Sequence, residues 1–198
     1  MASRPRNPFE GIDFNHEKPV PLRPLHATWS ASFQCSRAGF RTRLGKSSDE
    51  LKSHICTGWA YVLKRKIAAF LTIQADQLRF ESADKGKTVS LPDGDFEIVP
   101  AVKLMVFARD RRARGAGKAL LAWVIDYIVQ EIVPRLGVRF LTVDAYYEFD
   151  PQGKLYDTGP YYAEQFDFRF VDPTEKPCAG GEYRSMYLDL LPAIQSKK

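Results

Sequence analysis

The sequence is poor in the residues that build disulfide frameworks and zinc sites. Its 198 residues include only three cysteines, Cys35, Cys56 and Cys178. Their number is odd and they are scattered along the chain, whereas a disulfide framework or a zinc site needs paired or closely spaced cysteines. We therefore expect free thiols and no bound metal.

Long apolar segments are also missing. No apolar run reaches the roughly 18 residues that a membrane-spanning helix needs, and the start of the chain lacks the apolar stretch of a secretion signal. We therefore expect a soluble, cytoplasmic protein that does not associate with a membrane. Hydrophobic residues make up 44% of the chain, which is enough for one sizeable core, so a single domain is the simplest organisation.

Basic residues outnumber acidic ones, and the formal net charge is +5. Such a balance favours a polyanionic partner, either the phosphates of a cofactor or RNA, although it can also serve only to keep the surface soluble. Six of the 29 basic residues fall between Lys103 and Lys118. Because they gather in one short segment, we attribute the positive charge mainly to cofactor binding.

The first 30 residues form a proline-rich arm. They contain five of the 13 prolines and little apolar periodicity, so we expect them to be extended or disordered unless they pack on the domain, which we place at residues 31–192. Ser47 and the acidic residues after it are typical of a helix start. Two β-rich runs, residues 58–63 and 67–73, flank a basic turn and predict a hairpin. A long polar connection follows at 75–100.

The most informative segment is a glycine turn that follows a largely apolar, strand-like run at 101–109. Gly115 and Gly117 let the chain turn tightly and bring backbone N–H groups close to an anion. A helix that opens near Lys118 would add its positive dipole end. This layout predicts a binding site for a pyrophosphate.

Two common glycine loops do not fit this turn. A Walker A loop has four residues between its glycines and then Lys followed by Ser or Thr, whereas one residue separates Gly115 from Gly117 and Ala119 follows Lys118. A Rossmann fingerprint needs a third glycine, where this chain has Leu120, and an acidic residue about 20 residues further on. The turn is therefore neither a Walker A loop nor a Rossmann dinucleotide-binding site.

The helix after the turn has a clear period. Apolar residues recur at helical spacing on one face of residues 118–133, and Pro134 and Gly137 are expected to end the helix. Residues 140–145 then predict a short strand. The following segment, 146–160, is longer and more polar.

The turn resembles motif A of the GNAT acetyltransferases. That loop reads Gln or Arg, two residues, Gly, one residue, then Gly or Ala, and residues 114–119 fit at every defined position. Residues 161–168 resemble the family's Phe-Tyr-x-x-x-Gly-Phe element, and residues 184–190 resemble its closing strand. The resemblance extends from about Ile98 to Leu190, because strand, loop, helix, next strand and these two elements occur in the family's order.

The resemblance implies an α/β fold of the α+β type, with a mixed, mostly antiparallel central sheet flanked by helices. The sheet would splay between the strands of Phe107 and Val143, and segment 146–160 would be an insertion. Acetyl-CoA would be the co-substrate. Strand residues would pair with its pantetheine arm and loop residues would hold its pyrophosphate; these residues are Phe107, Ala108 and Arg109 on the strand, and Arg114, Gly115, Ala116, Gly117, Lys118 and Ala119 in the loop.

The resemblance also implies a tyrosine that protonates the departing thiolate. Tyr162 is the candidate, and Tyr161 is the alternative, because an ungapped alignment on Phe168 places Tyr162 on the family's phenylalanine. Asp167 stands where the family has glycine. Packing of both tyrosines in the core remains an equal alternative to a catalytic role.

The sequence does not identify a general base. All three histidines lie in the N-terminal third. Glu97, Asp144 and Glu148 are possible bases, but each is more typical of a solvated or structural carboxylate. Some family members act without a base.

Two functions from different classes remain open. The first is an acetyl-CoA-dependent N-acetyltransferase in which an amine attacks the thioester directly in a ternary complex. Within it, the chain is similar to the GNAT toxins of bacterial toxin-antitoxin pairs, which would imply aminoacyl-tRNA as acceptor, an antitoxin partner and a homodimer; small amines and protein amines stay open. The second is a non-catalytic module with the same fold that binds coenzyme A, a nucleic acid or a protein.

Overall fold

The computed structural model describes residues 7–35, 37–79 and 98–196. The chain divides into two compact units. Unit 1 comprises Met1–Gln74 and Met105–Val124, and unit 2 comprises Ala75–Leu104 and Ile125–Lys198. Strands β3 and β4 contribute residues to both units.

Within the described ranges, eight strands follow the order β1-β2-β3-β4-β5-β8-β7, with β6 paired to β5. Among strand pairs with a described register, only β4–β5 is parallel. The strands are β1 Val20–Pro21, β2 Thr57–Leu63, β3 Lys66–Arg79, β4 Ile98–Arg109, β5 Phe140–Phe149, β6 Leu155–Asp157, β7 Arg169–Phe170 and β8 Tyr183–Asp189. The mixed, mostly antiparallel sheet expected from the sequence is thus confirmed.

Seven helical segments accompany the strands in the described ranges: η1 Pro24–Ser32, α1 Ala38–Lys52, α2 Ala116–Tyr127, η2 Ile128–Ile132, α3 Val133–Leu136, α4 Gly159–Phe166 and α5 Leu191–Gln195. None of the helices described is both long and apolar enough to cross a bilayer.

Unit 1 contains the predicted hairpin. Strands β2 and β3 pair in antiparallel fashion, and Lys64 and Arg65 connect them with φ angles of 48° and 60°. Two successive residues in the left-handed region make the tight turn that suits the twist of a hairpin. The core of the unit is a cluster that includes Leu22, Phe33, Leu44, Ala60, Ile67, Phe70, Val106 and Ala108.

The described part of the proline-rich arm packs on unit 1. Phe9, Phe14 and Leu22 are buried, and β1 pairs with β2 through Val20 and Ala60. The condition under which the arm was expected to be ordered is therefore met for these residues, because their apolar side chains offset the entropy of ordering the segment.

The predicted helix start at Ser47 is wrong. Helix α1 begins at Ala38 and runs through Gly39 and Gly45. Glycine in a helix costs about 1 kcal/mol relative to alanine, but Leu44 on the same helix is fully buried in the core of unit 1. Ser47 Oγ donates to the carbonyl of Arg43 at 2.8 Å, so its hydroxyl bonds inside the helix and does not cap it.

The helix after the glycine turn starts near the predicted position, but Pro134 does not end it. It begins at Ala116, two residues before Lys118, and the chain stays helical past Pro134. A π turn, η2, precedes α3, and Pro134 occupies the first turn of α3, where no helical acceptor needs its missing N–H. Gly137 ends α3 in the left-handed conformation, with φ 62°, as expected.

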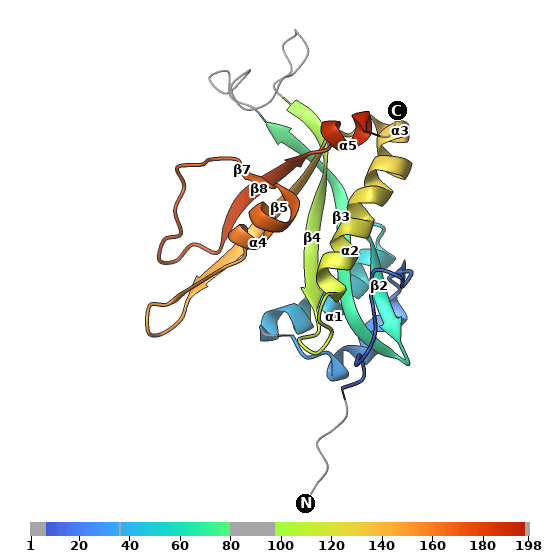
Figure 1. Ribbon diagram of the computed structural model, residues 1–198. Coiled ribbons are helices and arrows are strands. Elements are labelled where there is room, and N and C mark those ends of the chain that lie inside the picture. Colours follow the sequence, from blue (N-terminus) through green and yellow to red (C-terminus); the bar gives the residue numbers. More distant parts are fainter. Residues whose placement is uncertain (1–6, 36, 80–97, 197–198) are drawn as a thin grey trace, which may run out of the picture. The chain divides into compact units, whose positions relative to one another are not determined.

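Unit 2 is built around the antiparallel β5–β8 pair. Strand β5 continues to Phe149, and β6 pairs back on it from Leu155, so much of segment 146–160 is a hairpin that extends beyond α4 in Figure 1. The predicted closing strand is confirmed as β8. The unit's described core cluster is Leu78, Val99, Ala101, Phe140 and Tyr187.

Helix α4 ends at Asp167, which adopts the left-handed conformation with φ 61° and donates its N–H to Ala163 at 3.1 Å. Glycine is usual at this position because it lacks a Cβ, and aspartate is one of the few other residues that tolerate it. Aspartate in place of the family's glycine is therefore compatible with the local backbone.

Asp167→Gly is expected to raise the free energy of unfolding by about 0.5–1 kcal/mol, because it removes the left-handed strain of an exposed residue. Urea unfolding followed by circular dichroism measures the change. As a control, Glu164→Gly in the interior of the same helix should lower that free energy by about 1 kcal/mol. A loss of stability in Asp167→Gly would show that the left-handed conformation of Asp167 is not strained.

Candidate functional site

The structure brings the predicted coenzyme-binding residues together in unit 1. Phe107, Ala108 and Arg109 are the last three residues of β4, and Ala116–Ala119 open α2. The turn between them spans 110–115 and carries Arg114 and Gly115. The strand, turn and helix start therefore occur in the predicted order, and the binding roles stay predictions.

A buried carboxylate organises this turn. Asp110 is 0% exposed, and its two oxygens accept hydrogen bonds from four donors. Arg112 contributes its backbone N–H at 2.9 Å, Nε at 2.9 Å and Nη2 at 2.7 Å, and Gln34 contributes its backbone N–H at 2.9 Å. The N–H of Asp110 itself donates to Ala68 on β3 at 2.8 Å. Through its carboxylate and its backbone N–H together, Asp110 thus ties the turn to two segments that are distant in the sequence.

The electrostatics of this cluster favour the ionised acid. Burial by itself raises the pKa of Asp110, but the Arg112 side chain and the backbone N–H groups of Gln34 and Arg112 hold that pKa below its ordinary value. The pKa of Arg112 is raised in turn by its hydrogen bond to Asp110. Arg112 also donates to the carbonyl of Ser32 at 2.8 Å, so its guanidinium helps to hold the turn in this conformation.

Three backbone donors around the helix start have no acceptor among the described residues. Within the part of the chain that the structure describes, the N–H groups of Arg114, Gly115 and Gly117 make no hydrogen bond, whereas Ala116 donates to Ala113 and Ala119 donates to Gly115. Gly115 has a φ of 81°, a conformation in which glycine is favoured. Unpaired N–H groups at the positive end of a helix dipole form a suitable environment for a phosphate.

Space at Gly117 is limited. A Cβ built on this residue would lie 3.3 Å from Cζ of Phe107 and 3.3 Å from Cδ of Arg109. Glycine therefore lets the start of α2 approach the two side chains at the end of β4. A larger residue at position 117 would disturb this contact with Phe107 and Arg109.

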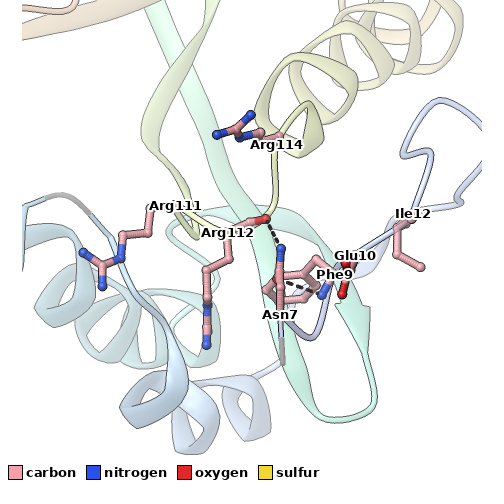
Figure 2. A pocket seen from close by; sticks show the side chains of 8 residues that line it. Asn7, Phe9, Glu10, Ile12, Arg111, Arg112 and Arg114 are labelled. Atoms are coloured by element: carbon pink, nitrogen blue, oxygen red, sulfur yellow. Dashed lines mark hydrogen bonds between the residues drawn. The ribbon is translucent and has the colours of Figure 1, made fainter. Parts of the chain in front are cut away.

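The N-terminal arm braces the other side of the turn. The side-chain amide of Asn7 donates to the carbonyl of Arg112 at 3.1 Å, and the Arg112 guanidinium lies 5.7 Å from the centre of the Phe9 ring. A hollow between arm and turn is lined by Asn7, Phe9, Glu10, Gly11, Ile12, Arg111, Arg112 and Arg114. The three arginine side chains point in different directions in Figure 2, so they do not converge on one ligand in this hollow.

The candidate catalytic tyrosine belongs to unit 2. Tyr162 lies on α4, is 7% exposed, and packs with its ring 5.5 Å from that of Phe168. Tyr161 precedes it and is 37% exposed. Burial, and to a lesser degree the neighbouring Tyr161 and Tyr156, raises the pKa of Tyr162 well above that of a free phenol. Tyr162 is thus a phenol that keeps its proton.

Neither described carboxylate considered as a base stands alone. Asp144 pairs with Lys103 at 2.6 Å and accepts from Ser185 Oγ at 3.0 Å. Glu148 accepts a hydrogen bond from the Tyr146 hydroxyl. Glu97 lies outside the described residues. We assign no base.

The role of Asp110 could not be predicted from the sequence, because Gln34 and Ala68 are far from it in the chain and only folding brings them into contact. The local signal was the spacing of Asp110 and Arg112, which permits an Asx-type turn with an adjacent cation. This spacing is common in turns, so by itself it does not indicate a buried carboxylate.

No family model matches the sequence, and no curated protein is detectably similar to it. Solved structures, in contrast, share its fold. They include AtaT complexed with acetyl-methionyl-tRNAfMet, with a TM-score of 0.61 and 12% identity over 85% of this chain and 92% of that one. A structure described as a bacterial toxin gives 0.61 and 16%, covering 91% and 96%. A tyrosine-to-phenylalanine mutant of KacT gives 0.62 and 15%, covering 92% and 100%. At such low identity these likenesses establish the GNAT fold and nothing finer.

Asp110→Asn is expected to lower the free energy of unfolding by about 2 kcal/mol near neutral pH, because it breaks a buried, charge-assisted cluster. Since the folded-state pKa of Asp110 is lowered, its stabilisation is complete above the ordinary carboxyl pKa of about 4 and is lost as the pH falls through the lower folded value. Urea unfolding at a series of pH values should show wild type and variant converging below about pH 4.

The matched control is Asp49→Asn, which removes an exposed ion pair with Lys52. It should change the free energy of unfolding by less than about 0.5 kcal/mol. An Asp110→Asn variant as stable as wild type near neutral pH would show that the carboxylate does not organise the turn.

Proposed function

We propose that the protein is an acetyl-CoA-dependent N-acetyltransferase in which a primary amine attacks the thioester directly in a ternary complex. The observation that carries the proposal is the set of unpaired N–H groups at the start of α2, on Arg114, Gly115 and Gly117. They sit at the positive end of a helix of 12 residues. The diphosphate of coenzyme A matches this site in charge and in its need for donors.

Three features of unit 1 support coenzyme A as the ligand. The turn is held in shape before any ligand arrives, because Asp110 and Arg112 close it. Arg114 and Lys118 are exposed beside the unpaired amides and add positive charge. The side chains of Phe107 and Arg109 lie against Gly117, so the end of β4 borders the turn, and an extended arm of the ligand would lie along this strand.

The fold neighbours favour the same reaction. One is AtaT bound with acetyl-CoA and the C-terminus of its antitoxin AtaR, and another is AtaT complexed with acetyl-methionyl-tRNAfMet. By analogy, we infer acetyl-CoA as co-substrate, aminoacyl-tRNA as the first acceptor to test and an antitoxin as a partner, with a homodimer also compatible. The net charge of +5 suits an RNA acceptor. Small amines and protein amines are the other acceptor classes.

The chain's own residues supply two parts of the chemistry. The turn fixes the acyl donor, which replaces a bimolecular encounter by a held geometry. Tyr162 carries a proton at its hydroxyl, and its raised pKa keeps that proton in place until it is given to a strong base, the departing thiolate. Overall, the N–C bond forms, the C–S bond breaks, sulfur gains the phenolic proton, and the tyrosine is reprotonated from the proton that the amine releases.

A tyrosine in this role has a parallel among the neighbours. AtaT and KacT have both been solved as tyrosine-to-phenylalanine mutants. Tyr162 is the better of the two candidates here, because the residue is buried, whereas Tyr161 is more than a third exposed.

The alternative is a module that keeps the fold and binds coenzyme A without catalysis. A thiol-release assay separates the two: the protein is incubated with acetyl-CoA and, in turn, small amines, peptides and aminoacyl-tRNAs. Acceptor-dependent release of free thiol supports the transferase and identifies the acceptor class. Acetyl-CoA binding with no release for any acceptor would favour the module. Absence of acetyl-CoA binding would overturn the transferase and leave only a module that binds a nucleic acid or a protein.

Gly117→Trp is expected to abolish acetyl-CoA binding, because the indole would fill the space where the helix start meets Phe107 and Arg109 and where the phosphates would lie. Isothermal titration calorimetry measures the binding. Gly45→Trp is the matched control, since Gly45 is an exposed residue of α1 with open space around it, and it should bind as wild type does. Tight binding by a folded Gly117→Trp protein would exclude this turn as the site.

Tyr162→Phe is expected to lower kcat by about a hundredfold with little change in KM for acetyl-CoA, because the variant lacks only the proton donor. Tyr161→Phe should retain wild-type kcat. Steady-state thiol release with the best acceptor measures both. The reverse order of effects would assign the role to Tyr161, and full activity in both variants would remove tyrosine from the mechanism.

A further inference from the structure

Helix α4, which carries Tyr162, is only eight residues long. Helices of this length are not stable by themselves, so their position depends on what holds their ends. In unit 2 the first residue of α4 is held by a carboxylate: Gly159 donates its N–H to Asp157 Oδ1 at 2.8 Å. An acidic group there also complements the helix dipole.

Arg184 of β8 in turn holds Asp157. Its Nη2 donates to Asp157 Oδ2, and its Nη1 donates to the carbonyl of Glu175 at 3.2 Å. The guanidinium carbon lies 4.1 Å from the centre of the Phe170 ring. Arg184 is 8% exposed. Three contacts in different directions therefore define one orientation of the guanidinium and, through it, of the carboxylate.

Phe170 closes the cluster against the helix. A Cβ built on Gly159 would lie 2.7 Å from Cζ of Phe170 and 3.1 Å from Asp157 Oδ1. The start of α4 is thus fitted against both the ring and the carboxylate that Arg184 contacts. Tyr162 lies one turn along the helix, with its N–H 3.3 Å from the carbonyl of Thr158.

The cluster is poorly explained by stability alone. Nε of Arg184 is buried and has no hydrogen-bond partner among the described residues. A buried unpaired donor is destabilising, and well-packed apolar side chains often replace a buried ion pair without loss of stability. What an ion pair of fixed geometry supplies is directional constraint on the groups that it contacts.

We propose that Arg184 is a positioning residue that acts through Asp157 and α4 to place the hydroxyl of Tyr162 for proton donation. The proposal rests on the proposed function, since it names how the candidate proton donor is oriented. It assigns to Arg184 no contact with either substrate.

The test compares kcat and KM in four proteins: wild type, Arg184→Lys, Tyr162→Phe and the double variant. Lysine keeps the charge but cannot make the planar, three-way contact. We expect Arg184→Lys to lower kcat by about tenfold to a hundredfold, because small misplacements of a reacting group have effects of this size. KM for acetyl-CoA should stay within about twofold, since only transition-state stabilisation changes.

The double variant separates positioning from general destabilisation. If Arg184 acts through Tyr162, Arg184→Lys has no further effect on kcat once the hydroxyl is absent. Amide hydrogen exchange, read out without substrates, should be faster over 159–166 in Arg184→Lys. Arg139→Lys is the matched control: Arg139 also pairs with an aspartate, Asp189, at 2.8 Å and lies 5.3 Å from a phenylalanine ring, Phe140, in the same unit. It should leave kcat and the exchange of α4 unchanged.

Wild-type kcat in Arg184→Lys, an equal loss in both tyrosine backgrounds, or an equal loss in Arg139→Lys would each overturn the proposal. If Arg184→Lys does not fold, Asp157→Asn replaces it, with the same expectations. Absence of thiol release by wild type, or full activity of Tyr162→Phe, would instead overturn the proposed function or the role of Tyr162, and the positioning role with it.

Discussion

The burial of one carboxylate is the constraint on which the candidate coenzyme site depends. Asp110 is fully enclosed and stays ionised because Arg112 and two backbone N–H groups compensate its charge. With the carboxylate satisfied by Arg112 and Gln34, the chain leaves β4, reverses and enters α2 with the N–H groups of Arg114, Gly115 and Gly117 unpaired among the described residues. A phosphate can then bind without reorganisation of the protein, which is the condition for strong electrostatic recognition.

The second candidate site follows the same physical logic in unit 2. A short helix gains a fixed position because charged groups hold its start and a left-handed residue, Asp167, ends it. The tyrosine between these ends is enclosed and its pKa is raised. In both sites the group that would contact the ligand is a single donor, a backbone amide or a phenol. A neighbouring ionic cluster fixes the position of that group.

Local sequence signals predicted the elements that depend on local physics. The hairpin and the glycine turn follow from periodicity and turn residues, the closing strand follows from the family resemblance, and all three are confirmed. The start of α1 was wrong, because burial of Leu44 outweighs two helix glycines. The contacts of Asp110 with Gln34 and of Arg184 with Asp157 could not be predicted. They join residues that are far apart in the chain, and only the fold brings these residues into contact.

The central claim is that the amides after Arg112 bind a diphosphate. Two-dimensional ¹H–¹⁵N NMR spectra of the labelled protein, titrated in parallel with coenzyme A and with pantetheine, test it residue by residue. The account predicts large shifts of the Arg114, Gly115 and Gly117 amide signals with coenzyme A and none at these positions with pantetheine, which lacks the diphosphate. Saturable binding of coenzyme A that leaves these three signals in place would contradict it.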